Sequence, residues 1–289
     1  MLKRNLRVLR RFSSNSQVIR MDIRTIWEIS RKEFYEHLKT KRFIIISSLY
    51  AIVFLVSVWI LSHYSGMMAL DFQTIISNTH SSASIFYAIL PIALSFDLIS
   101  GEQMKKSIYL LLSKPVEREE VVIGKILGVI MVVCAIIIPV STVGNLIAGA
   151  FRGFPSLDII GRTYIYLVVV IFACTCYITL SMLFSVISKT SGISLILSLI
   201  AGWFGLNMLY TIALMYAFLT GNFTEIPWYT KVLYAVSPSN DLSVALNIIS
   251  ENASSVDPIS VPQSIVALTI FFVTTFLLSV ILFKRKELI

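Results

Sequence analysis

Residues 97–125, which read DLISGEQMKKSIYLLLSKPVEREEVVIGK, decide the fold of this chain. They form a polar, basic stretch between two strongly apolar segments, one that ends near Phe96 and one that begins near Val121. No G-x-x-x-x-G-K-[ST] phosphate-binding loop occurs in the sequence. A charged segment between apolar ones, with no catalytic motif beside it, indicates a contact surface for another protein.

The composition is that of an integral membrane protein. Of the 289 residues, 56% are hydrophobic and 14% are charged, and the mean hydropathy is +0.83. Soluble domains have about 45–50% apolar and about 25% charged residues. Because a soluble interior would not accommodate so much apolar side chain, we expect an all-α membrane protein. Its three cysteines lie inside apolar segments, in no disulfide or zinc-binding pattern.

Six segments are predicted to cross the membrane. A spanning helix requires roughly 20 apolar residues, and five segments meet that requirement clearly. The second is weaker, because it is strongly apolar only from Ser84 to Phe96. We extend it back to about Thr74, since otherwise the basic loop after it would lie on the outer side. The predicted spans are 43–61, 74–98, 121–148, 164–187, 193–219 and 265–283.

The distribution of basic residues predicts the orientation. With six spans and both termini in the cytoplasm, 21 Lys and Arg residues fall inside and 3 fall outside. Cytoplasmic loops of membrane proteins carry such an excess, so we predict an N-in/C-in topology. Twelve of the basic residues precede Phe43 and are expected to rest against anionic membrane lipid. Nucleic acid is not an expected partner, because no base-reading motif accompanies the charge.

The segment before the first span has two parts. Residues 1–20 are rich in Arg and Ser and are predicted to be a disordered basic leader, with Met21 a candidate for the true start. An organellar presequence would have a similar composition. From Asp22 to Lys41 the apolar residues recur mostly three or four positions apart, with a wider gap at Ser30, which predicts an amphipathic helix in the membrane interface. The apolar positions of that helix are Ile23, Ile26, Trp27, Phe34 and Leu38.

The loop between the fifth and sixth spans, residues 221–261, is too long for a simple turn. Two short apolar runs, 228–236 and 242–249, are separated by Ser237-Pro238-Ser239. We expect them to form short helices that dip into the outer leaflet, and a plain surface loop is the alternative. Asn222 and Asn252 begin Asn-x-Ser/Thr sequences and are candidate glycosylation sites.

Residues 97–125 resemble the signature region of type-2 ABC exporter permeases, the six-helix membrane subunits that pair with ATP-binding-cassette subunits. The matching residues are Asp97, Ile99-Ser100-Gly101-Glu102, a short helix over 106–112, Ser113-Lys114-Pro115-Val116, Arg118 and Gly124-Lys125. Ser107-Ile108 stands where other members often have Gly-Thr. With the six spans, the amphipathic helix and the long outer loop, the resemblance covers residues 21–289, which form the predicted permease domain.

The resemblance implies a function. The chain would be the membrane permease subunit of an ABC exporter, forming the translocation path with a second copy or a similar subunit. ATP and Mg would be bound by separate cytoplasmic ATP-binding-cassette subunits, so no cofactor, metal or catalytic residue is expected on this chain. Segment 99–125 would carry nucleotide-driven motion into the spans, with a second contact at turn 188–192. The residues expected to couple to the ATPase are Glu102, Lys105, Lys106, Pro115, Arg118, Glu119 and Lys189.

Local chemistry suits this role. Ser100-Gly101 is expected to end the second span, because Gly releases the chain from helical geometry. Pro115 would stop the short helix. Glu102, Lys105, Arg118, Glu119 and Glu120 are expected to face the cytoplasm, where a partner can contact them.

Other functions remain as alternatives. A basic loop that only sets topology would make the chain a membrane anchor or binding subunit without transport. A secondary transporter usually requires ionisable groups deep in its spans, and here Asp97 and Lys125 lie near the predicted cytoplasmic ends. An intramembrane hydrolase would require a nucleophile with a base or a metal cluster, and neither H-E-x-x-H nor G-x-S-x-G occurs.

Overall fold

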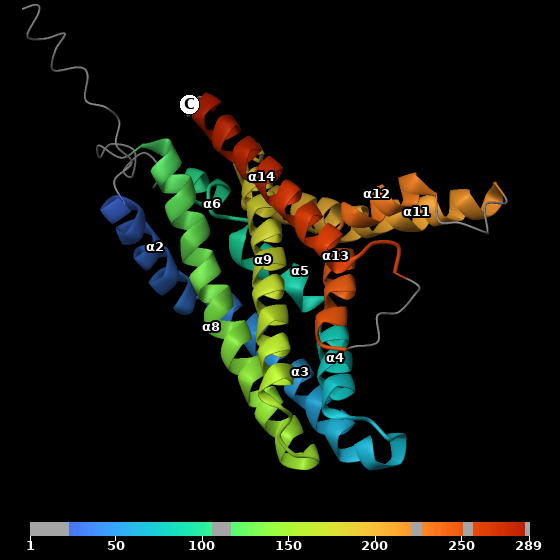
Figure 1. The fold of residues 1–289 in the computed structure, drawn as a ribbon. Coiled ribbons are helices and arrows are strands. Elements are labelled where there is room, and N and C mark those ends of the chain that lie inside the picture. The colour runs from blue at the N-terminus through green and yellow to red at the C-terminus, as the bar shows by residue number, and fades with distance from the viewer. Residues whose placement is uncertain (1–22, 106–116, 221–226, 251–256, 287–289) are drawn as a thin grey trace, which may run out of the picture.

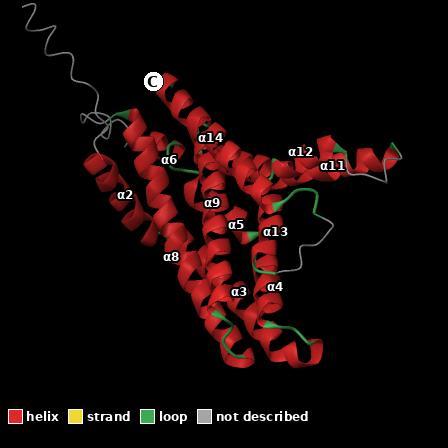
Figure 2. Cartoon of the chain, in the orientation of Figure 1, coloured by secondary structure: helices red, strands yellow, loops and turns green. Residues whose placement is uncertain are grey.

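The protein is described by a computed structural model that covers residues 23–105, 117–220, 227–250 and 257–286. Within these ranges the regular structure is entirely helical (Figure 2). Five helices are long and apolar enough to cross a membrane. They are α3 (Lys41–Met68), α8 (Arg118–Arg152), α9 (Leu157–Ile187), the continuous run of α10 (Ser191–Leu197), η1 (Ser198–Gly205) and α11 (Leu206–Leu219), and α14 (Val261–Arg285). The predicted all-α, multi-span fold is confirmed.

The segment predicted as the second span is bent. α4 (Phe72–Ser82) is followed by α5 (Phe86–Ser95) and α6 (Ser100–Met104), and the two parts, 72–82 and 86–104, meet at an angle of 44°. Asp71 caps α4 by accepting a hydrogen bond from the amide of Thr74 at 3.0 Å. The helix therefore begins slightly before the predicted Thr74, but the prediction of one unbroken helix was wrong. Serine and threonine side chains that bond to their own helix carbonyls favour such bends, and Thr79 and Ser82 do so just before the break.

α8 and α9 form the centre of the bundle (Figure 1). In the most apolar stretch of α9, 72% of the residues are buried, compared with 17% in α3 and in α14. Most of the apolar side chains on α3, on α14 and on the α10–α11 run are left for lipid or another protein chain to cover. α8 continues as one helix through Pro139.

The helix before the first span, α2 (Ile23–Leu38), lies along the first turns of α8 (Figure 1). Its buried and half-buried stripe includes Ile26, Ile29, Ser30, Glu33 and His37. Two residues of the predicted apolar face point elsewhere, since Ile23 is 81% exposed and Trp27 is 58% exposed. The helix was correctly predicted. Ser30, where the apolar pattern was interrupted, lies on the face that packs against α8.

The long loop after the fifth span contains two short helices, as predicted, but the second begins at Pro238, four residues before the predicted run 242–249. α12 (Trp228–Ala235) packs against α11, and α13 (Pro238–Ala245), followed by the 3₁₀ turn η2 (Leu246–Ile248), packs against α9 and α14 (Figure 1). We call α12 and α13 the outer helix pair. Pro238 is the first residue of α13, a position where the lack of an amide hydrogen costs nothing.

One end of the bundle gathers the predicted cytoplasmic elements, and we call it the basic end. It contains α2, α6, the start of α8, the turn 188–192 and the end of α14 (Figure 1). Several predicted features lie outside the described residues: the leader 1–20, the short helix 106–112 with Lys106, Pro115, and the glycosylation candidates Asn222 and Asn252.

Candidate functional site

Two glycines of α8 allow α2 to approach closely at the basic end. A Cβ atom added to Gly124 would lie 2.8 Å from the Cβ of Ile29, and one added to Gly128 would lie 2.6 Å from the Cβ of Glu33. Small residues four positions apart let two helix backbones pack at short range. The Gly124-x-x-x-Gly128 sequence therefore serves the contact between α2 and α8.

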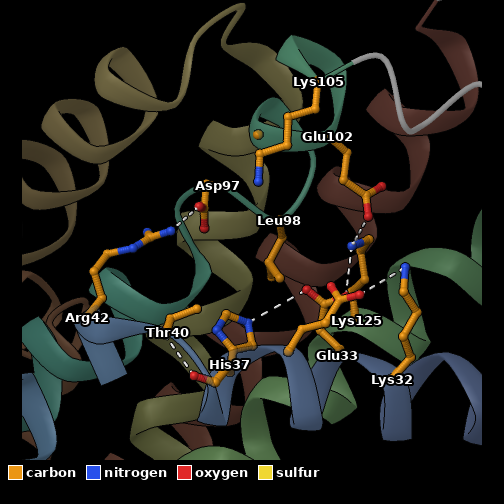
Figure 3. A pocket seen from close by; sticks show the side chains of 12 residues that line it. Lys32, Glu33, His37, Thr40, Arg42, Asp97, Leu98, Glu102, Lys105 and Lys125 are labelled. Atoms are coloured by element: carbon orange, nitrogen blue, oxygen red, sulfur yellow. Dashed lines mark hydrogen bonds and ion pairs between the residues drawn. The ribbon is translucent and has the colours of Figure 1, made fainter. Parts of the chain in front are cut away.

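Lys125 lies between these glycines and is almost completely buried, with 1% of its surface exposed. Its ammonium donates hydrogen bonds to Glu33 Oε2 of α2 at 3.0 Å and to Glu102 Oε1 of α6 at 2.8 Å (Figure 3). We call Glu33, Glu102 and Lys125 the charged junction. A buried ammonium is tolerated only when acceptors replace its water shell, so three elements are held at one point.

A pocket of about 400 Å³ opens beside the charged junction (Figure 3). On one wall, Arg42 at the start of α3 forms an ion pair with Asp97 at 2.6 Å. On another, His37 Nε2 lies 3.7 Å from Glu33 Oε1, and burial lowers the pKa of His37 against the raising effect of Glu33. The lining residues are Lys32, Glu33, Glu36, His37, Thr40, Arg42, Asp97, Leu98, Gly101, Glu102, Lys105 and Lys125. The pocket thus joins α2, α3, α6 and α8.

α6 is fastened to the fourth span by Ser185. The amides of Ile99 and Ser100 both donate to Ser185 Oγ at 3.0 Å. These are amides at a helix start, where no carbonyl of the same helix is available. Ser100 therefore begins a helix, and the prediction that Ser100-Gly101 ends the second span was wrong. The helix is interrupted near the predicted position, between Ser95 and Ser100, but the chain then forms a new helix, α6.

The start of α8 holds the end of α14. The guanidinium of Arg118 donates to the carbonyls of Phe283 and Lys284 at 3.0 Å and of Lys286 at 2.8 Å. Glu119 forms an ion pair with Lys284. Positive charge at a helix C-terminus compensates the carbonyl groups that lack intrahelical partners. Arg118 and Glu119 thus connect the third and sixth spans.

The two predicted ATPase contacts meet at the basic end. Met104 Sδ at the end of α6 accepts a hydrogen bond from the amide of Ser191 at 3.4 Å, so α6 touches the turn between the fourth and fifth spans. Lys105 and Lys189 are both exposed on this side. The structure therefore brings together the two segments that the sequence separates by more than eighty residues.

Comparison with known proteins decides the family. The profile of the family described as "ABC-2 family transporter protein" matches residues 27–288, which is most of the chain. The chain belongs to the ABC-2 transporter family. It is also 28% identical over 104 residues to a probable ABC transporter permease protein, NosY, of Stutzerimonas stutzeri, and 27% identical to the NosY of Pseudomonas aeruginosa. Each alignment covers 36% of this chain and 38% of the relative.

The ABC-2 chain is thus a multi-pass membrane protein of a transporter family. Among the described residues, no group of three or more His, Cys, Asp or Glu side chains is placed to hold a metal ion.

Several predicted contact residues of this ABC-2 protein point inward. The side chain of Glu102 is 16% exposed and binds Lys125. Glu120 is 4% exposed and bonds to the amide of Glu117 in a capping box at the start of α8. Arg118 binds the end of α14. Glu102 and Glu120 are thus less accessible to a partner than expected, Arg118 is half-buried, and all three side chains hold elements of the basic end together.

Sequence reasoning missed Glu33. Its carboxylate is buried in the contact between α2 and α8. A signal was present in the sequence: Lys125 follows Gly124 in an apolar stretch, and a lysine there needs an acidic partner. Nothing in the sequence identified which glutamate would supply it.

Proposed function

We propose that this ABC-2 protein is the permease subunit of an ABC exporter, and that a separate ATP-binding-cassette ATPase docks at the basic end. The observation that carries the proposal is the charged junction. Lys125 ties α6, the helix just before segment 106–116, to α2 and to the third span. A force on that segment would therefore reach the spans through ionic contacts.

α6 is suited to distribute such a force. It is bonded to α8 through Glu102, to α9 through Ser100 and to the turn before α10 through Met104. In addition, Gln103 Oε1 accepts a hydrogen bond from Lys286 at the end of α14, at 3.0 Å. A displacement of this five-residue helix would thus be transmitted to four spans, the third to the sixth.

The exposed side chains of Lys105 and Lys189 supply the docking surface in this proposal. Lys105 follows Met104 and Lys189 lies two residues before Ser191, the two residues that are in contact. An acidic patch on a cytoplasmic ATPase would complement these lysines. ATP and Mg would be bound by the ATPase. A second copy of the chain, or a similar subunit, would complete the translocation path, and its apolar surface would cover part of the exposed α3, α11 or α14. Export as the direction is proposed from the resemblance of residues 97–125 to exporter permeases.

Purification of the full-length protein from its native host in a mild detergent tests the proposal. Mass spectrometry of the co-eluting proteins and an assay of ATP hydrolysis are the readouts. We expect a stoichiometric partner with a Walker motif and ATPase activity that co-elutes with the permease. A stable preparation with no such partner and no ATPase activity would contradict the proposal and favour a membrane anchor without transport.

A further inference from the structure

Besides the packing of α12 on α11, one amide of the fifth span bonds to the outer helix pair. Asn207 is the second residue of α11, directly after the π-helical turn η1. Its Nδ2 donates to the carbonyl of Trp203 in η1 at 2.6 Å. Its Oδ1 accepts hydrogen bonds from Ser237 Oγ at 3.0 Å, just before α13, and from Ser239 Oγ at 2.8 Å, in the first turn of α13. π-helical turns occur often at functional positions, and here the turn is bonded to the amide that holds the pair.

A second hydrogen bond attaches the pair to the fourth span. The hydroxyl of Tyr177 on α9 donates to Ser239 Oγ at 3.1 Å. Ser237 is completely buried. These hydroxyl and amide bonds act beside the apolar packing of α13, whose Leu242, Val244 and Ala245 are buried.

α13 carries a buried acidic residue, Asp241. It is 1% exposed, and its Oδ1 has no hydrogen-bond partner among the described residues. An ionised carboxylate in such a place would lose its water without compensation. Burial accordingly raises the pKa of Asp241 to about 8.

The ionisable groups around Asp241 include no cation that would stabilise a carboxylate, as far as the described residues extend. α9 presents the thiol of Cys176 and α12 presents the phenol of Tyr234, whereas the cation of α12, Lys231, is exposed. η2 has no ionisable side chain, and those of α14 are Lys284 and Arg285 at its far end. The protonation of Asp241 therefore depends on whether α13 stays packed.

We propose that Asp241 is a proton-binding site that latches the outer helix pair onto the fourth and sixth spans. When the carboxyl of Asp241 is protonated, α13 stays packed against α9 and α14, which is the closed state of the outer helix pair. When the pair lifts away, the carboxyl meets water and releases its proton. Because the proton is bound in the packed state and released in the open one, opening becomes easier as the pH rises.

The pH range follows from the two states. In water an aspartate titrates near pH 3.9, and packed Asp241 titrates near pH 8. Between these values each opening releases one proton, so the opening constant rises up to about tenfold per pH unit. Above about pH 8 both states are ionised and the dependence ends. Below about pH 4 both are protonated.

Hydrogen–deuterium exchange of residues 228–248 in the full-length protein, reconstituted in lipid nanodiscs, tests the latch. We expect the exchange rate, corrected for the intrinsic effect of pH, to rise between pH 6 and 8 and to level off above pH 8. Asp241→Asn keeps the shape and cannot ionise, so its corrected rate should be lower and independent of pH. Asp257→Asn is the matched control, because Asp257 lies in the same loop and bonds to Asn247 at 2.6 Å, and it should behave as the wild type.

Infrared spectroscopy gives a second readout that does not depend on opening. A protonated carboxyl band should be present in the wild type at pH 6, decline near pH 8 and be missing in Asp241→Asn. The proposal is overturned if this band is absent from the wild type at pH 6, or if the corrected exchange of wild type and Asp241→Asn has the same pH dependence.

Discussion

The ammonium of Lys125 lies 3.0 Å from the carboxylate of Glu33, although 92 residues separate them in the sequence. This ion pair fixes α2 against α8, and α2 leads directly into the first span. With Glu102 as the second acceptor of the same ammonium, α6 is fixed at the same point. The first and third spans therefore contact α6, at the start of segment 99–125, through buried polar groups. Such a contact is sensitive to single substitutions.

Replacement of Lys125 by Met should destabilise the protein strongly. The change leaves two poorly exposed carboxylates without the ammonium they share, and removal of one partner of a buried ion pair costs about 3–5 kcal/mol. Unfolding of the purified protein in mixed micelles measures the change. A double variant, Lys125→Met with Glu33→Gln, should recover part of the loss.

Lys32→Met is the control for that experiment. Lys32 forms a pair with Glu36 at 3.4 Å on the exposed face of α2, with side chains 53% and 57% exposed. Exposed pairs contribute about 0–1 kcal/mol. If Lys125→Met were as stable as Lys32→Met, the charged junction would not hold the basic end together.

Gly128→Ala should separate α2 from α8. The added Cβ would lie 2.6 Å from the Cβ of Glu33 and 2.9 Å from the carbonyl of Ser30, and overpacking of this kind costs about 1–3 kcal/mol. Gly161→Ala is the control, because nothing lies within 4 Å of a Cβ at that position of α9. Alanine is the better helix former by about 1 kcal/mol, so thermal denaturation should show opposite signs for the two variants. Equal effects would argue against the close contact.

Arg118→Met should loosen the last turn of α14. The guanidinium supplies donors to three carbonyls there, and hydrogen bonds to a charged group contribute about 1.5–3 kcal/mol. Hydrogen exchange at residues 283–286 should therefore increase by about 10- to 100-fold. Arg285→Met removes an exposed cation of the same helix and should leave the exchange unchanged. An increase of the same size in both variants would mean that Arg118 does not cap the helix.

Much of the fold could be predicted because the signal for a membrane span is strong. A run of about 20 apolar residues rarely forms anything but a spanning helix, and the five clear spans are all present as helices. That the outer loop holds two short helices was also predictable, but the start of the second was not, because Pro238 and Ser239, read as a separator, form its first turn. The break in the second span was missed, since hydropathy averages over the polar residues near Ser82 that bond to their own backbone. The π-helical turn in the fifth span likewise has no signature in hydropathy.

The candidate site was predictable in place but not in detail. Segment 97–125 and turn 188–192 were expected on the same side, and the contact of Met104 with Ser191 brings them together. The partner of Lys125 could not be predicted, because an ion pair between distant segments leaves no periodic pattern. The burial of Asp241 could not be predicted either, since nothing in its neighbours in the sequence indicates that α13 buries it. Long-range packing decides such positions, and local sequence does not report it.

Retention of the ATPase subunit by surface variants tests the central claim most directly. Lys105→Glu with Lys189→Glu reverses two exposed charges at the basic end, and Lys231→Glu reverses an exposed charge on α12. We predict that the double variant remains folded but co-purifies with at least about tenfold less ATPase than the wild type, because repulsion replaces attraction at a docking surface. Lys231→Glu should retain the ATPase fully. Full retention by the double variant would contradict docking at the basic end.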